Sequence, residues 1–174
     1  MSKTAIFYGP VGGAVNRVAD KIKTQIGDDK VEMVPVKGAT AADIEKFDKL
    51  IFGISTVGKD TWDSKFANND WGIFLPEIEK VNYSGKKVAI FGLGDHVTYA
   101  ATFVDHMAIL AKKLTENGAV LSGQVAAAGY EFDESEAVID GKFVGLPVDE
   151  DFEPELTDKR VASWVKQLAG EFGF

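Results

Sequence analysis

Short apolar runs alternate with amphipathic stretches along this chain of 174 residues. Apolar runs of this length are typical of strands that are buried on both faces of a parallel sheet. Between the runs, apolar residues recur every three or four positions, a spacing that predicts helices with one buried face. The expected strands are Thr4–Tyr8, Val31–Val36, Leu50–Ile54 and Lys87–Phe91, and a fifth begins at Ala119–Leu121. The expected helices run from Val15 to Ile26, from Thr40 to about Phe47, from Trp71 to Glu79 and from Phe103 to Leu114, and a last one begins at Thr157.

This alternation predicts an α/β fold in which a five-stranded parallel sheet lies between two layers of helices. One segment departs from the pattern. It is rich in glycine and acidic residues, runs from about Gln124 to Leu156, and interrupts the fifth strand. The sequence shows neither a repeat nor a linker, so residues 1–174 are expected to form a single domain.

Composition narrows the possible functions. The chain has no cysteine, which excludes disulfides, thiol catalysis and cysteine-ligated metals or iron–sulfur clusters. It has no apolar run of about eighteen residues and no signal-peptide pattern, so the cytoplasm is the expected compartment. A net charge of −8 argues against nucleic-acid binding. The same charge suits docking to a basic partner protein, although solubility alone explains it equally well.

Ligands of open parallel sheets bind at the carboxyl ends of the strands, which directs attention to three loops. The loop after the first strand contains Gly9, Pro10, Val11, Gly12 and Gly13 and continues into the helix through Ala14 and Val15. No Ser, Thr, Asp or Asn stands at the helix start, so its first amides are available to an anion. Water bound to a glycine-rich turn is the alternative, and the loop taken by itself favours it.

The other two loops follow the third and fourth strands. A long polar stretch from Ser55 to Asp70 contains Trp62, which either covers a flat ligand or anchors the loop. After the fourth strand, Gly92-Leu93-Gly94-Asp95 form a turn, and Tyr99 beyond it either stacks on a planar ligand or lies on the surface. His96 and His106 have no carboxylate at metal-ligand spacing, so no metal site is predicted. A serine-nucleophile elbow is also missing from the sequence.

Three stretches of the chain resemble long-chain flavodoxins, and together they cover roughly the C-terminal two-thirds. The stretches are Asp70-Trp71 through Gly92-Leu93-Gly94-Asp95, then Gly129-Tyr130-Glu131-Phe132 through Gly141-Lys142-Phe143-Val144-Gly145-Leu146, and finally Leu156-Thr157-Asp158-Lys159-Arg160-Val161 with Trp164. The resemblance implies a flavodoxin-like strand order of 2-1-3-4-5, with the insertion in the fifth strand that marks the long-chain class. It further implies a low-potential, monomeric carrier that moves electrons between redox proteins on non-covalently bound FMN.

The resemblance also assigns roles to residues. Tyr99 matches the tyrosine that stacks on the flavin, and Val57 falls where many members carry a stacking tryptophan, for which Trp62 is a possible substitute. The peptide after Gly58 matches the one that contacts flavin N5, and Leu93, Gly94 and Asp95 match the loop whose backbone binds the pyrimidine edge. The full set of expected cofactor-binding residues is Gly9, Pro10, Val11, Gly12, Gly13, Ala14, Val15, Ser55, Thr56, Val57, Gly58, Trp62, Leu93, Gly94, Asp95 and Tyr99.

The phosphate loop departs from the family pattern. Members usually show Ser/Thr-x-Thr-Gly-x-Thr after the first strand, whereas positions 10–15 here read Pro-Val-Gly-Gly-Ala-Val. Each lost hydrogen bond to a charged group is worth about 1.5–3 kcal/mol. The alternative is therefore a flavodoxin-derived binding protein that takes dephospho-flavin, another planar ligand or only a protein partner. A flavin-dependent reductase is a third hypothesis, but the sequence offers no evident nicotinamide site.

Overall fold

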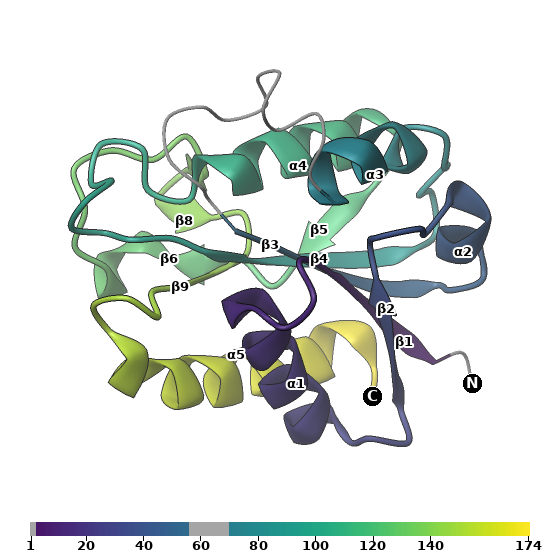
Figure 1. Cartoon of the computed structure of the whole chain (residues 1–174), viewed down its shortest axis with the longest axis horizontal. Coiled ribbons are helices and arrows are strands. Elements are labelled where there is room, and N and C mark those ends of the chain that lie inside the picture. The colour runs from purple at the N-terminus through teal and green to yellow at the C-terminus, as the bar shows by residue number, and fades with distance from the viewer. Residues whose placement is uncertain (1–2, 56–69) are drawn as a thin grey trace.

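A parallel β-sheet forms the centre of the molecule in the computed structural model, which describes residues 3–55 and 70–174 (Figure 1). Neighbouring strands pair in the order β2-β1-β3-β4-β5, so the predicted α/β class and strand order are confirmed. The strands are β1 (Thr4–Tyr8), β2 (Val31–Pro35), β3 (Lys49–Ser55), β4 (Lys87–Leu93) and β5 (Val120–Ser122).

Helices cover both faces of this sheet, as the fully apolar strands require. One face is covered by α1 (Ala14–Ile26) and α5 (Thr157–Phe172), and the other by α2 (Ala41–Glu45), α3 (Asp70–Ile78) and α4 (Asp105–Glu116) (Figure 1). Alternate residues of β1 serve the two layers. Ile6 and Tyr8 join the cluster with α1 and α5, whereas Phe7 joins the cluster with α3 and α4.

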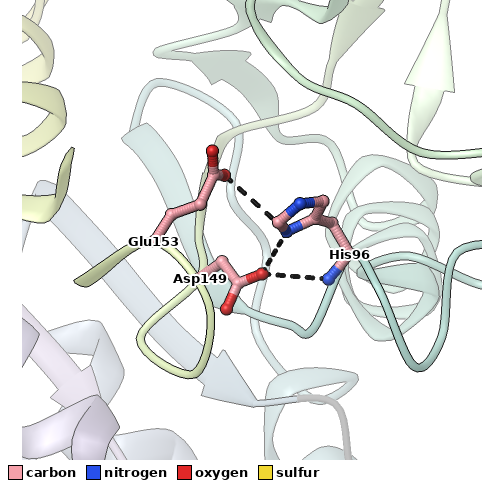
Figure 2. Close-up of side chains that lie close together, drawn as sticks. All are labelled: His96, Asp149 and Glu153. Atoms are coloured by element: carbon pink, nitrogen blue, oxygen red, sulfur yellow. Dashed lines mark hydrogen bonds and ion pairs between the residues drawn. The ribbon is translucent and has the colours of Figure 1, made fainter. Parts of the chain in front are cut away.

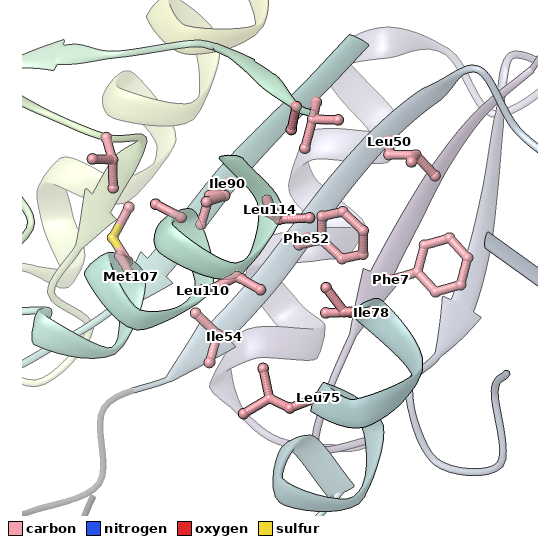
Figure 3. Close-up of a cluster of buried hydrophobic side chains, with 14 of the residues drawn as sticks. Phe7, Leu50, Phe52, Ile54, Leu75, Ile78, Ile90, Met107, Leu110 and Leu114 are labelled. Carbon is pink, nitrogen blue, oxygen red and sulfur yellow. The ribbon is translucent and has the colours of Figure 1, made fainter. Parts of the chain in front are cut away.

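The core between the sheet and α3–α4 is built from interlocking aromatic and branched side chains (Figure 3). Phe7 stacks on Phe74 with ring centroids 5.8 Å apart, and Phe52 lies beside Phe7 at 5.6 Å. Trp71 is buried among them and donates its indole N–H to the carbonyl oxygen of Gly53. This core fixes the end of β3 and the start of α3, which both border the carboxyl edge of the sheet.

The fifth strand is interrupted as the sequence predicts. Both β5 and β9 (Leu146–Val148) pair in parallel with β4, β5 beside its first half and β9 beside its last residues. The segment between them forms a small antiparallel sheet in the order β6-β8-β7. Its strands are β6 (Val125–Ala126), β7 (Val138–Ile139) and β8 (Lys142–Phe143), with a 3₁₀ helix at Ala127–Gly129 after β6. A second 3₁₀ helix, Pro154–Leu156, leads into α5.

Some predicted boundaries are wrong at their ends. Gly92 and Leu93, expected in a loop, are the last residues of β4, because β3 pairs with them on one side and β9 on the other. Phe103, expected in α4, lies before that helix, since Val104 adopts a left-handed conformation with φ of 50°. The short helix α2 ends at Glu45 rather than near Phe47.

Candidate functional site

The carboxyl ends of β1, β3 and β4 meet at one edge of the sheet. Tyr8 stands opposite Gly53 in the β1–β3 pairing, and Ser55 stands opposite Leu93 in the β3–β4 pairing. The structure therefore brings the predicted binding loops after β1 and β4 to the end of β3, where Ser55 lies. Four predicted residues fall outside the described part of the chain: Thr56, Val57, Gly58 and Trp62.

The loop after β1 places bare backbone at the start of α1. Gly13 is the N-cap residue and has no side chain to cap the helix, and an α-helix leaves its first amides without an intrahelical acceptor. Gly12 has a φ of +83°, a left-handed conformation that glycine adopts at little cost. Pro10 and Val11 are exposed, with more than half of the Val11 surface open to solvent. An anion at this place meets N–H groups and the positive end of the helix dipole.

Two residues of the predicted phosphate loop are turned inward. Val15 is 2% exposed and packs in the core under α1, so its side chain faces away from the loop and only its backbone N–H remains as a candidate donor. Gly9 is also buried, and a Cβ atom there would lie 2.6 Å from Cγ2 of Val36. Its role is thus to let the chain pass close to the end of β2, in addition to any role at a ligand.

Asn16, which the sequence analysis missed, closes the same turn. The backbone N–H of Gly12 donates to Oδ1 of Asn16 at 2.9 Å, and Nδ2 of Asn16 lies 3.3 Å from a carboxylate oxygen of Asp20. An asparagine four residues after a glycine in a helix-opening loop is the signal that was available in the sequence. This side chain places an amide at the helix start, in a stretch where the usual hydroxyl groups are lost.

The loop after β4 is folded around Asp95. Its Oδ1 accepts hydrogen bonds from the backbone N–H groups of Val97 and Thr98 at 2.9 and 2.7 Å, and its carbonyl oxygen accepts one from the N–H of Tyr99. The N–H of Gly94 donates to the carbonyl oxygen of Val148, which ties the loop to β9. The Asp95 side chain therefore shapes the loop, and Tyr99 is left half-buried at its far end.

A histidine also supports the end of β3. His106 on α4 is fully buried, and its Nδ1 lies 3.0 Å from the carbonyl oxygen of Ser55. Burial lowers the pKa of His106, and the hydrogen bond to Ser55 opposes this only in part. A neutral imidazole with its proton on Nδ1 donates to that carbonyl oxygen. The helix α4 thereby fixes the residue from which the long third loop departs.

His96 lies among carboxylates that its sequence neighbourhood did not reveal (Figure 2). Oδ2 of Asp149 accepts hydrogen bonds from the backbone N–H of His96, at 3.0 Å, and from its ring Nδ1. Oε1 of Glu153 lies 3.7 Å from the same ring nitrogen and 3.1 Å from the Arg160 guanidinium. Sequence spacing shows no carboxylate partner for His96, but the β9 connection brings Asp149 and Glu153 to it from more than fifty residues away.

The composition of this cluster favours an ion-pair network over a metal centre. Its nitrogen and oxygen atoms lie within 4.8 Å of one another, which suits a divalent cation in distance alone. Arg160 already supplies a positive charge to Glu153. Both oxygens of Asp149 already accept hydrogen bonds, Oδ2 from the backbone and ring of His96 and Oδ1 from the backbone N–H groups of Asp151 and Phe152.

Among the helices of the described residues, none is long and apolar enough to span a bilayer.

Comparison with known proteins agrees with this architecture. The family model described as flavodoxin matches residues 6–164. The flavodoxin of Trichodesmium erythraeum is 41% identical over 175 residues, covering 99% of each chain, and flavodoxin 1 of Escherichia coli is 37% identical over 98% of this chain and 95% of that protein. The crystal structure of Fusobacterium nucleatum flavodoxin bound to flavin mononucleotide is 26% identical and superposes with a TM-score of 0.88 over 98% of this chain and 99% of that one. The chain belongs to the flavodoxin family.

Proposed function

We propose that this protein carries electrons between redox proteins on non-covalently bound FMN and turns over no substrate of its own. The observation that carries the proposal is the uncapped start of α1, which lies at the same sheet edge as the ends of β3 and β4. One site there can take both the anionic and the planar part of a flavin nucleotide. The similarity to a Fusobacterium nucleatum flavodoxin that holds flavin mononucleotide supports the choice of cofactor.

Backbone groups are the proposed ligands of the FMN phosphate. The N–H groups of Gly13, Ala14 and Val15 open the helix, and they replace the hydroxyl donors that the family usually has. A Cβ atom built on Gly12 meets no atom of residues 3–55 or 70–174 within 4 Å, so these residues leave open space on that side. Asn16 holds this turn through its bond to Gly12. The residues present thus fit an anion, although they offer it fewer hydrogen-bond donors than the hydroxyl-bearing phosphate loop usual in the family.

The flavin ring is proposed to lie between the loops after β3 and β4. The backbone of Leu93, Gly94 and Asp95 would face its pyrimidine edge, and Tyr99 would cover one side of the ring. Ser55 lies at the start of the loop after β3. The proposal also includes four residues of that loop that lie outside the described residues: Thr56, Val57, Gly58 and Trp62. The hydrogen bonds within residues 94–99 favour this arrangement because they hold the loop in one shape before a ligand arrives.

FMN supplies the chemistry of accepting and releasing electrons, and the surrounding residues are proposed to set its reduction potential. Asp95, Asp149 and Asp151 lie close enough together that they interact electrostatically. Burial, and then repulsion from Asp149, Asp95 and Glu150, raises the pKa of Asp151. Negative charges near the ring oppose the extra negative charge of the reduced cofactor. The proposed consequence is a low reduction potential.

The same acidic region is the proposed docking surface for basic partner proteins. Val97 and Phe152 are each at least half exposed and lie in the loops that carry Asp95 and Asp151. Exposed apolar side chains beside acidic ones suit a transient contact with a basic protein. The net charge of −8 supports electrostatic attraction of such a partner. A monomeric, cytoplasmic carrier remains part of this proposal.

The visible absorption spectrum of the purified protein tests the proposal. We expect a yellow protein whose flavin spectrum is restored when FMN is added back to the stripped protein. Stepwise chemical reduction should bleach this spectrum reversibly, and a quinone with NAD(P)H should leave it unchanged. A colourless protein that ignores added FMN would overturn the proposal. The alternative binder of dephospho-flavin is not favoured, because near full-length relatives are flavodoxins.

A further inference from the structure

His96 connects the loop after β4 to the segment that follows β9. Its backbone N–H and its ring Nδ1 both contact Oδ2 of Asp149 (Figure 2). One residue earlier, Val148 accepts a hydrogen bond from Gly94. The two contacts fix the loop at Gly94 and at His96, on either side of Asp95, whose backbone is the proposed ligand of the flavin's pyrimidine edge.

Asp149 is built to hold this position. Its side chain is fully buried, and its second oxygen, Oδ1, accepts the N–H groups of Asp151 and Phe152 at 2.9 and 2.8 Å. Burial by itself raises the pKa of Asp149, but the N–H donors of His96, Phe152 and Asp151 and the His96 ring outweigh it and lower the pKa below its ordinary value. The side chain therefore stays an anion at neutral pH, and its oxygens remain hydrogen-bond acceptors for the loop that carries His96.

The surroundings of the His96 ring are strongly negative. Asp149 and Glu153 face Nδ1 from the segment after β9, and Asp95 precedes His96 in the chain. Arg160 on α5 is the facing cation, and it lies against Glu153. Two aromatic side chains also border the ring: Phe103 and Phe152 meet it edge-on with centroids 6.5 and 6.2 Å away. Only 14% of the His96 side chain is exposed.

We propose that His96 and Asp149 form a positioning pair that holds residues 94–99 in the shape that binds the flavin ring. The proposal rests on the proposed FMN site. It assigns His96 a role through the loop rather than through direct contact with the cofactor. Neither residue is among those that the sequence pattern of the family suggests for the site.

Riboflavin is the appropriate probe, because it has the ring without the phosphate and so reports on the ring site rather than on the phosphate loop. We expect His96→Ala to bind riboflavin about threefold to tenfold more weakly than the wild type, because the hydrogen bond between the ring and Asp149 is lost. His96→Gln should recover most of that affinity, since the glutamine amide can donate to the same carboxylate oxygen. Asp149→Asn should also weaken binding. Glu155→Gln removes an exposed acidic group nearby and should behave like the wild type.

Two results would overturn the proposal: a riboflavin affinity of His96→Ala equal to that of the wild type, or a loss in His96→Gln as large as the loss in His96→Ala. A similar loss in the Glu155→Gln control would also overturn it, because general surface charge would then explain the effect. A wild type that binds neither riboflavin nor FMN would instead contradict the proposed function. In that case the ligand-free protein decides: the amide NMR signals of Gly94 and Val97 should move in His96→Ala and return toward their wild-type positions in His96→Gln, and signals that stay fixed in His96→Ala would overturn the positioning pair.

Discussion

The side-chain amide oxygen of Asn16 accepts a hydrogen bond from the backbone N–H of Gly12 at 2.9 Å, across the turn that opens α1. This contact stabilises a left-handed glycine at the place where flavodoxins usually present hydroxyl groups. The turn is therefore held by a side chain from the first turn of the helix. If the site binds FMN, its phosphate meets a backbone that is already ordered, which lowers the entropic cost of binding.

Replacement of Asn16 tests this arrangement. In Asn16→Ala the Gly12 turn loses a hydrogen bond worth about 1 kcal/mol, so FMN affinity should fall about fivefold. Riboflavin affinity should change little, because riboflavin has no phosphate to place at this turn. Titration of both flavins by fluorescence quenching measures the two affinities. Equal losses for both would show that Asn16 acts on the whole site instead of on the phosphate end.

Gly12 itself should resist substitution for a backbone reason. Its φ of +83° is strained for any residue with a Cβ atom, although the space around it is open. We expect Gly12→Ala to lower the free energy of unfolding by about 1 kcal/mol. Gly129→Ala is a matched control, because its surroundings are equally open and its φ is not positive. The control should be neutral or slightly stabilising in a urea titration, and a similar loss in both variants would contradict the explanation.

His106 should make stability fall on mild acidification. Burial lowers its pKa from the ordinary value of 6.5. Below about pH 6.5 the unfolded chain therefore binds a proton on this residue, whereas the folded protein does not. The stability that this residue contributes is complete above that pH. It is lost as the pH falls toward the lowered pKa, with a slope of at most about 1.4 kcal/mol per pH unit.

The variant His106→Gln isolates this contribution, since glutamine can still donate to the Ser55 carbonyl oxygen but does not titrate. Its free energy of unfolding should depend less on pH between 6.5 and 5 than that of the wild type. Urea unfolding at several pH values provides the measurement. An identical pH dependence in both proteins would mean that other groups govern acid stability.

The acidic docking surface predicts a salt-sensitive reaction with basic acceptors. In Asp151→Lys, the second-order rate of electron transfer to a basic haem protein should fall about twofold to fivefold at low salt, because attraction is replaced by repulsion. Asp28→Lys makes the same charge change in the exposed loop before β2, at the opposite edge of the sheet. Stopped-flow measurements should show a smaller effect for this control, and high salt should reduce both effects. Equal effects at both positions would argue against a localised surface.

Much of the fold follows from the sequence because its signals are local. The strands β1 and β3 are buried on both faces and so appear in the sequence as apolar runs. The helices α1 and α5 are buried on one face and so show apolar residues at helical spacing. Thr40 is the N-cap of α2, as the sequence suggests, and its backbone N–H donates to Oδ2 of Asp43 at 2.9 Å. Even the interrupted fifth strand is visible as a change in composition.

The failures occur where partners come from distant parts of the chain. Leu93 continues β4 because it pairs with Ser55 of β3 and with Val148 of β9, and no local pattern around Leu93 indicates these partners. His96 meets Asp149 across 53 positions, so spacing rules for metal or charge pairs could not find the cluster. The assignment of Val15 to the phosphate loop stays a prediction for its backbone N–H, since its side chain packs in the core on the buried face of α1.

The central claim is that bare amides at the start of α1 bind the phosphate of FMN. A paired titration of stripped protein with FMN and with riboflavin tests it directly, since the two ligands differ only in that phosphate. The account predicts that FMN binds at least about tenfold more tightly, the equivalent of one hydrogen bond to a charged group. Equal affinities for the two flavins, or no binding of FMN, would contradict it.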